Sequence, residues 1–330
     1  MQLCQPRHRP LVEHERLACD AGLTLPGPPT LADATLPAAM ARPWREDGSE
    51  EADAALLARA RRDDRQALEA LIARHQPWIF NIALRMLYEH ADAEDATQEI
   101  LIKVLKALPS FRGESKFSTW LYRIAVNHVL NDRKAKWAAS EAVWSFADAS
   151  AALKRVPDLD PPDPSTIPVP FEILVEEVKV SCVMGTLLCL DRRQRLVFIL
   201  GTVFGVSDDV GAELVGVTPA NFRQLLSRAR RDLYEYLHGN CSLVEPGAAC
   251  KCARKTRAYI QEGFVDPRNL RFTASRLRRI RDLVVDERAD ETWAAYVKVA
   301  DDLFRNHPFC ESSEQIERLR RVLKETAPPE

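Results

Sequence analysis

The chain has 330 residues, of which 46% are hydrophobic and 28% charged, and its formal net charge is −2. This length allows two or three modest domains. No apolar run approaches the roughly 18 residues that a membrane-spanning helix requires. Pro, Arg and Glu interrupt the N-terminal stretch, so we expect no signal-peptide core and a cytoplasmic protein without membrane insertion.

The chain changes character near residue 50. Residues 1–50 are rich in Pro and Ala without a sustained period, which is typical of a disordered tail. Over residues 51–137 apolar side chains recur at helical spacing, and Pro77 in a first-turn position predicts that a second helix begins there. No segment shows the alternation of a β-strand, so the sequence predicts an all-α fold.

An acidic segment, DAEDATQE, begins at Asp92. Asp92 is predicted to be a helix N-cap with Asp95 completing a capping box, and Pro109 is predicted to end the helix. Carboxylates repel phosphates, so this patch is unsuited to nucleic acid and must face a protein. The acidic and amide side chains of this patch are Asp92, Glu94, Asp95, Gln98 and Glu99, and the family resemblance given below implies that they bind the partner.

Four aromatic residues fall within twelve positions after this helix, namely Phe111, Phe117, Trp120 and Tyr122. Flat rings beside cations suit unstacked bases and their phosphates. Phe111 and Phe117 flank a loop around Gly113 and are the better candidates for base contact, whereas Trp120 and Tyr122 are expected to be partly structural. The residues predicted to contact DNA here are Phe111, Arg112, Lys116, Phe117, Thr119, Trp120, Arg123, Asn127 and Lys134.

Residues 138–170 hold six prolines among several aspartates, which is typical of an extended acidic linker. A second helical domain is predicted over residues 171–237, and its end has the sequence pattern of a helix–turn–helix. One helix runs through Asp208–Val215, Gly216 lies in the turn, and Thr218 with Pro219 forms an N-cap and first-turn pair.

The helix that begins at Pro219 has two faces, with Phe222, Leu226 and Leu233 pointing inward. Such a helix fits the major groove, where Arg and Gln can bond base edges. An ordinary amphipathic helix with solvated arginines would show the same pattern. The outward side chains predicted to contact DNA are Asn221, Arg223, Gln224, Arg228 and Arg231.

Residues 238–330 are predicted to form a helical extension, and within it residues 251–281 hold ten cations against two acids. A His-x-x-Cys pair followed by Cys-x-Cys resembles structural zinc sites. The candidate ligands are His238, Cys241, Cys250 and Cys252. His307 or Cys310 are alternative fourth ligands, and a set of free thiols explains the same spacing. No cofactor is required.

Three strings carry a resemblance to a known family: DAEDATQE, FRGESKFSTWLYRIAVNHVLND and TPANFRQLLSRARRDL. Asp92–Trp137 resembles region two, and Leu190–Leu237 resembles region four, of a bacterial RNA polymerase sigma factor of the extracytoplasmic-function (ECF) type, within the sigma-70 family. The resemblance implies two small helical domains joined by an extended linker, with the C-terminal extension outside the family pattern.

The resemblance also implies roles. The acidic helix would dock on the clamp helices of core RNA polymerase, the aromatic loop and basic helix would open promoter DNA at the minus-ten element, and the recognition helix would read the minus-thirty-five element. Such a protein is a transcription initiation factor and not an enzyme. Some are held by an anti-sigma factor, whose existence here the sequence does not reveal.

Two departures from the family pattern are visible. Leu225 stands where the family often has a cation, and Gly211 inside a helix costs about 1 kcal/mol relative to Ala.

Two other functions remain open: a helix–turn–helix DNA-binding regulator that never contacts core polymerase, and a zinc- or redox-responsive regulator that acts through the cysteine cluster. We also expect the extension to act on the two domains, by contacting DNA or by shielding the polymerase-binding face.

Overall fold

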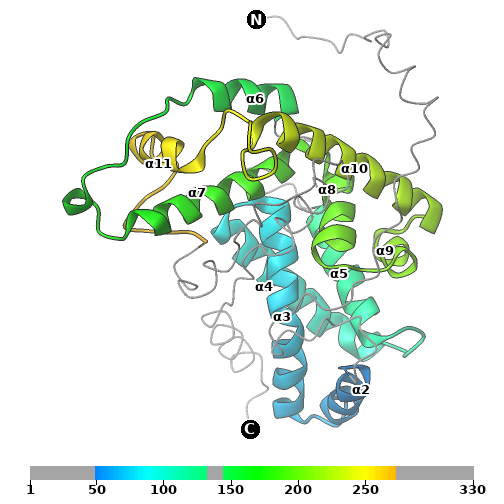
Figure 1. The fold of residues 1–330 in the computed structure, drawn as a ribbon. Helices are drawn as coiled ribbons and strands as arrows, with labels where there is room; N and C mark the ends of the chain where they lie inside the picture. Colours follow the sequence, from blue (N-terminus) through cyan, green and yellow to red (C-terminus); the bar gives the residue numbers. More distant parts are fainter. Residues whose placement is uncertain (1–48, 132–143, 273–330) are drawn as a thin grey trace, which may run out of the picture. The chain divides into compact units, whose positions relative to one another are not determined.

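The structure, a computed structural model, describes residues 49–131 and 144–272 (Figure 1). Every regular element in these ranges is a helix, and they contain no β-strand, only an isolated bridge between Cys241 and Cys250. The all-α prediction is confirmed. None of the described helices has the length and apolarity needed to cross a bilayer. The predictions for the N-terminal tail and for Lys134, His307 and Cys310 lie outside the described residues.

The first group of helices is built around a long central one. The group contains α2 (Ser49–Ala60), α3 (Arg65–Leu87), α4 (His90–Ala107) and α5 (Phe117–Asn131). The side chain of Asp64 accepts a hydrogen bond from the backbone N–H of Ala67 at 3.0 Å and so caps the start of α3. Because α3 contacts α2, α4 and α5, its apolar side chains form the core that positions the other three.

Pro77 lies inside α3, where the sequence predicted the start of a new helix. That prediction is wrong, because α3 continues through the proline. A proline inside a helix removes a backbone hydrogen bond and costs about 3 kcal/mol. The following residues Trp78 and Ile79 are buried, and burial of large apolar side chains, at roughly 1.5–3 kcal/mol each, is enough to offset that cost.

α4 begins earlier than the sequence predicted. Its N-cap is Glu89, which makes no side-chain capping bond, and Asp92 is not the cap. Tyr88 has a φ of +69° and turns the chain sharply at the end of α3, so the helix already resumes at His90. Asp92 instead lies in the first turn of α4, where its negative charge interacts favourably with the positive end of the helix dipole.

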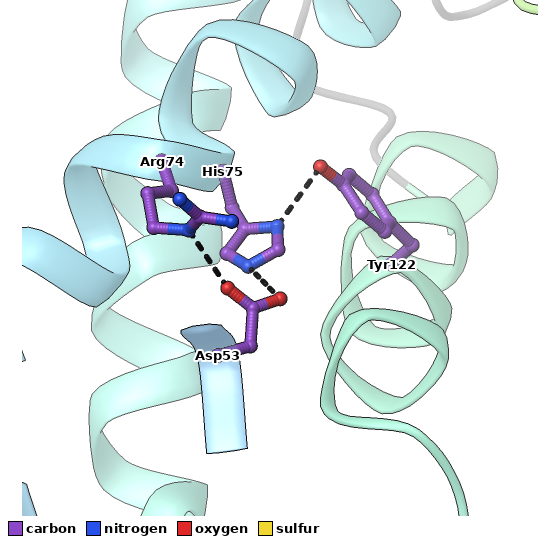
Figure 2. Close-up of polar contacts among 4 residues, drawn as sticks. All are labelled: Asp53, Arg74, His75 and Tyr122. Carbon is purple, nitrogen blue, oxygen red and sulfur yellow. Dashed lines mark hydrogen bonds and ion pairs between the residues drawn. The ribbon is translucent and has the colours of Figure 1, made fainter. Parts of the chain in front are cut away.

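A buried polar network joins α2, α3 and α5 (Figure 2). The carboxylate of Asp53 lies 2.9 Å from Nε of Arg74 and 3.0 Å from Nε2 of His75, and Nδ1 of His75 lies 3.2 Å from the Tyr122 hydroxyl. Burial alone would raise the pKa of Asp53, but the hydrogen bonds and charges of His75 and Arg74 lower it below the ordinary value. Burial raises the pKa of Tyr122, which stays neutral. The network therefore fixes α5 against α2 and α3.

Replacing Asp53 by Asn is expected to lower the free energy of unfolding at neutral pH by about 1–3 kcal/mol. The folded pKa of Asp53 is below its unfolded value of about 3.9, so its contribution is present above that value and disappears as pH falls through the folded pKa. Urea unfolding of both proteins should show the difference shrinking below about pH 4. Asp63→Asn, at an exposed carboxylate, is the control. A difference that stays constant down to low pH would contradict this assignment.

The described part of the predicted linker contains a helix, α6 (Phe146–Arg155). The hydroxyl of Ser145 accepts a hydrogen bond from the backbone N–H of Asp148 at 3.0 Å and begins this helix. The chain is extended after α6, and its acidic side chains pair with cations of the C-terminal extension in two ion pairs, Asp158–Lys255 and Asp160–Arg254. The linker is therefore not extended throughout, and its aspartates face basic residues of the same chain.

The second group of helices ends in a helix–turn–helix. The group contains α7 (Phe171–Thr186), α8 (Arg192–Phe198), α9 (Asp208–Val215) and α10 (Pro219–Asn240). Gly216 adopts a φ of +71° in the turn, the Thr218 side chain accepts a hydrogen bond from the backbone N–H of Asn221 at 3.2 Å, and Pro219 opens α10. The predicted α9, turn and cap are all confirmed.

Two glycines let neighbouring segments approach α10 closely. A Cβ at Gly211 of α9 would lie 2.4 Å from Cζ of Phe222, and a Cβ at Gly201 would lie 2.7 Å from Cδ2 of Leu226. Both distances are shorter than side-chain atoms tolerate. Gly211, which costs helix propensity, is thus required by the packing of the helix–turn–helix.

Gly211→Ala is expected to lower the free energy of unfolding, because overpacking a core costs about 1–3 kcal/mol against a gain of about 1 kcal/mol in helix propensity. The matched control is Gly239→Ala near the end of α10, where a Cβ would meet nothing within 4 Å. That variant should be neutral or more stable. Thermal unfolding of both proteins distinguishes them. Equal melting temperatures would show that the Phe222 ring moves aside for the new methyl group without a cost in stability.

The extension packs on α7 as far as Phe272. Its helix α11 (Cys252–Gln261) contacts α7. The carboxylate of Glu177 on α7 is 2% exposed and accepts hydrogen bonds from the backbone N–H groups of Arg271 at 2.8 Å and Phe272 at 3.2 Å. Buried apolar side chains of both segments form a small cluster, made of Leu174, Val178 and Val265. This part of the extension therefore belongs to the core around α7.

Candidate functional site

The five polar residues predicted to bind a protein partner lie on one side of α4. The opposite side is buried against α3 and α5 and includes Ala93, Ala96, Thr97, Ile100 and Val104. Asp95 is exposed, and the other four members are half-buried. Asp92, Asp95 and Glu99 follow one another at spacings of three and four residues, and Glu94 and Gln98 are four residues apart, so the five occupy adjacent turns of one face. We name this set the acidic face: Asp92, Glu94, Asp95, Gln98 and Glu99.

The aromatic residues after α4 form a cluster. The rings of Phe111 and Phe117 lie 5.7 Å apart, and Trp120 lies 5.0 Å and 5.7 Å from them. Phe111 and Phe117 are each 7% exposed, so the expectation that these two rings face bases is not met in this arrangement. The guanidinium of Arg61 covers the Phe111 ring at 5.6 Å and donates a hydrogen bond to the Phe111 carbonyl. Trp120 is the member of this cluster that stays partly exposed.

Two exposed cations lie in the loop beside this aromatic cluster. The Arg112 side chain is 83% exposed and its Nη1 lies 3.9 Å from Glu114. Lys116 is 53% exposed and forms an ion pair with Glu50 of α2. Since exposed ion pairs of this kind contribute at most about 1 kcal/mol, both cations can exchange their partners for phosphates.

The polar stripe of α5 faces α9. The Arg123 guanidinium donates a hydrogen bond to Oε1 of Glu213 at 2.5 Å, and the two side chains are 42% and 46% exposed. Asn127 is exposed, whereas Thr119 is 9% exposed and is shielded within the protein. The surface that the sequence predicts to meet DNA is therefore partly covered by the helix–turn–helix.

The outer face of α10 is polar and exposed. Its members are Asn221, Arg223, Gln224, Arg228 and Arg231. Nη1 of Arg223 lies 3.5 Å from Oδ2 of Asp208 across the turn, and Arg231 pairs with Asp232 at 3.2 Å. The predicted core residues Phe222, Leu226 and Leu233 are buried, as expected. The helix thus offers cations and amides on one side of a rigid support.

A buried arginine ties α8 to the first group of helices. Arg195 is 1% exposed and donates hydrogen bonds to Met86 O at 2.8 Å, at the end of α3, and to the turn after α7. The acceptors in that turn are the carbonyl oxygens of Leu187, Leu188 and Leu190. Burial lowers the pKa of Arg195 to about 10, so it stays protonated at neutral pH. No sequence pattern reveals these bonds, because carbonyl acceptors are common to all residues.

The end of the described extension contacts the start of α4. The ring of Phe272 lies 5.6 Å from that of His90 and 6.1 Å from that of Tyr88. Nη1 of Arg271 lies 3.3 Å from Oε1 of Glu89. Burial lowers the pKa of His90. The extension therefore borders the acidic face, a contact whose residues the sequence did not identify.

Three of the four residues predicted as metal ligands come together. Cys241, Cys250 and Cys252 line one small pocket, and the fourth cysteine in its wall is Cys182 of α7. His238 is not in that wall; its side chain is 41% exposed and lies 3.6 Å from Glu245. The cysteines are free thiols. Within residues 49–131 and 144–272, no group of three or more His, Cys, Asp or Glu side chains is placed to hold a metal ion.

Comparison with known proteins points to one family. The family model for sigma-70 region 2 matches residues 71–139. The chain is 40% identical over 83 residues to the RNA polymerase sigma-H factor of Pseudomonas aeruginosa, an alignment that covers 25% of this chain and 43% of that protein. It is 28% identical over 184 residues to the ECF RNA polymerase sigma-E factor of Escherichia coli, covering 54% of this chain and 90% of that protein.

Two solved structures are also similar. The first is CnrH in complex with the cytosolic domain of CnrY, at 22% identity and a TM-score of 0.40, covering 56% of this chain and 97% of that chain. The second is the sigma factor RpoE in complex with the anti-sigma factor NepR from Bartonella quintana, at 20% identity and a TM-score of 0.36, covering 52% and 96%.

Proposed function

The chain belongs to the sigma-70 family of RNA polymerase sigma factors, in its ECF group, and we propose that it binds core RNA polymerase and directs promoter-specific transcription initiation. The observation that carries this proposal is the unit formed by α4 and α5. It presents a carboxylate face on α4 and, on α5, a tryptophan supported by two other rings, with two exposed cations in the loop between these helices. This combination fits a protein that grips a basic protein surface while it captures bases.

The acidic face is the proposed contact with core polymerase. Its carboxylates are held on a helix whose other side is buried, so the charges keep a fixed spacing. Charge complementarity of this kind steers association and fixes the register of the two proteins. Arg271 and Phe272 contact the beginning of the same helix, which places the extension beside the proposed contact.

Trp120 is the proposed platform for an unpaired base at the minus-ten element. Phe111 and Phe117 support its ring from within the protein, and Arg112 and Lys116 provide positive charge nearby for the strand. Extruding a base costs a few kcal/mol, while stacking on an aromatic ring returns roughly 1–3 kcal/mol per base. Binding energy is therefore sufficient to open DNA, and the proposal assigns the chain no catalytic step.

The outer face of α10 is the proposed reader of the minus-thirty-five element. Arg223, Gln224 and Arg228 are exposed and carry the donors that pair with base edges in the major groove. Leu225 lies half-buried between them and offers no hydrogen bond, so this position contributes shape rather than base recognition.

Reading both elements requires α5 and α9 to separate. The minus-ten and minus-thirty-five elements are roughly 25 base pairs apart, which is about 85 Å at 3.4 Å per base pair. In the structure Arg123 of α5 is bonded to Glu213 of α9, so the two DNA-binding surfaces lie together. In this proposal the arrangement is a closed form, and a partner such as an anti-sigma factor that favours it would reduce activity.

Glu213→Gln is expected to raise the affinity for promoter DNA that carries both elements by up to about fivefold, because an exposed ion pair contributes up to about 1 kcal/mol to the closed form. Fluorescence titration of labelled promoter DNA with the purified chain measures this. Asp209→Asn, at an exposed carboxylate on the same helix, removes the same charge without removing the bond and should change nothing. A decrease for Glu213→Gln would contradict a closed resting form.

Run-off transcription from a promoter library tests the proposed function. Core RNA polymerase mixed with this protein should produce transcripts from a subset of templates that share two short elements. Core enzyme alone should not select these templates. Specific binding of the protein to DNA without any selected transcript would favour a DNA-binding regulator, which the comparisons with known proteins do not support.

A further inference from the structure

We propose that Cys182, Cys241, Cys250 and Cys252 form a site for one thiophilic metal ion, with zinc the expected occupant. These four side chains, as many ligands as structural zinc takes, line one pocket of about 20 Å³. A pocket of that size admits a single water-sized guest. The inference does not depend on the proposed function, since it concerns the contact between the extension and α7.

The backbone brings the three C-terminal cysteines to one place. The N–H of Cys241 bonds to Leu237 O at 2.7 Å at the end of α10, and the N–H of Glu245 bonds back to Cys241 O at 2.9 Å. Cys250 returns beside Cys241 in a backbone bridge. Cys252 then begins α11. The turn is therefore fixed by main-chain hydrogen bonds and keeps three thiols close together without a metal.

Cys182 supplies the fourth thiol from a different element. It lies on α7, which α11 contacts, and it stands on the pocket wall with Leu153, Val183 and Leu243. The other polar side chains in the wall are Lys179, Asn240 and Tyr236. The Lys179 amine is paired with Glu176, and the Asn240 amide is hydrogen-bonded to Ser150 and to the Tyr236 carbonyl. A site with four sulfur ligands and no open position is typical of structural zinc.

Metal binding here replaces protons. Each thiol loses its proton to the solvent, and four metal–sulfur bonds replace bonds between the metal and water. The side chains must rotate inward from their present positions, since they are not yet placed around a common centre. No oxidant takes part. The result is a link between α7, the end of α10 and α11, which fastens the extension to the second group of helices.

The first test is the zinc content of the full chain after anaerobic, reducing purification, measured by mass spectrometry of metals. The expected value is about one zinc ion per chain. Cys182→Ser should lose most of it, whereas Cys189→Ser should retain it, because Cys189 is buried nearby but is absent from the pocket wall. His238→Ala should also retain it. Loss of zinc in Cys189→Ser or His238→Ala to the same extent as in Cys182→Ser would overturn the proposed ligand set.

The second test avoids variants that fail to fold. Co²⁺ is added to the wild-type chain after zinc removal under reducing conditions, and the expected result is intense tetrahedral absorption with sulfur-to-cobalt charge transfer. Absence of both zinc and a cobalt spectrum, with all thiols reacting freely with a thiol reagent, would overturn the proposal. A Cys241–Cys250 disulfide that persists through the reducing purification, found by mass spectrometry in place of metal, would overturn it too. Either result leaves the proposed role in transcription unaffected.

Discussion

Replacing Asp95 and Glu99 by lysine is expected to abolish assembly with core RNA polymerase. Asp95 is exposed, so its reversal leaves the buried side untouched. Glu99 is half-buried, with Oε2 3.9 Å from Nε2 of the buried His128, so folding of the double variant is checked by thermal unfolding. Like charges brought together at an interface cost several kcal/mol, and every 1.4 kcal/mol is tenfold in affinity. We therefore expect a loss of at least about 100-fold in affinity for core enzyme, measured by fluorescence anisotropy at moderate salt.

The matched control places the same charge change elsewhere. Glu51 and Glu262 are both exposed and lie outside the acidic face, and the double lysine variant at these positions should bind core enzyme as the wild type does. Promoter DNA binding by α10 alone should survive both changes. If the Asp95 and Glu99 variant still assembled normally, α4 would not be the polymerase contact and a DNA-binding regulator would become the better account.

Trp120→Ala is expected to reduce promoter opening by about 5–150-fold, which corresponds to the roughly 1–3 kcal/mol of one stacked base. Holoenzyme assembly should be unaffected, because Trp120 is outside the acidic face. The measurement is permanganate reactivity of unpaired thymines in the minus-ten element with saturating holoenzyme. Trp120→Phe keeps a ring at the site and should recover most of the opening.

Trp144→Ala is the control for this variant, since Trp144 is 41% exposed and lies outside the aromatic cluster. It should open promoters as the wild type does. Trp120 also packs on Phe111 and Phe117, so thermal unfolding is recorded for each variant, and opening is compared at a temperature where all are folded. Normal promoter opening by the folded Trp120→Ala variant would show that Trp120 is not the platform for an unpaired base.

Local signals in the sequence predicted the helix–turn–helix well. Thr218, Pro219 and Gly216 each act through their own backbone or the next turn, so their roles do not depend on distant residues. The side of α4 that bears the acidic face was predictable for the same reason, because helical period alone separates it from the buried side.

Features decided by distant residues were not predictable. Pro77 has a strong local preference for a helix start, but burial of its neighbours keeps α3 continuous. The local sequence predicts that Phe111 is an exposed loop aromatic. Its burial comes from Arg61, directly after α2, and from Phe117 and Trp120 across the loop. Cys182 carries no spacing signal at all, since α7 meets the later cysteines only after folding.

The close approach of α5 and α9 was also beyond sequence patterns. Arg123 and Glu213 are ninety positions apart, and each reads as a solvated charge on its own helix. Their bond matters because it joins the two surfaces that we propose to contact DNA. The hydrogen bonds of Arg195 were likewise not predictable, because its acceptors are backbone carbonyls, which every residue has.

Co-elution from a size-exclusion column tests the central claim most directly. The purified chain is mixed with core RNA polymerase at moderate salt and applied to the column. If the carboxylates of α4 bind core enzyme, the chain should elute together with it in a single stable complex. Separate elution of the two, even when salt is lowered to strengthen charge pairing, would contradict it.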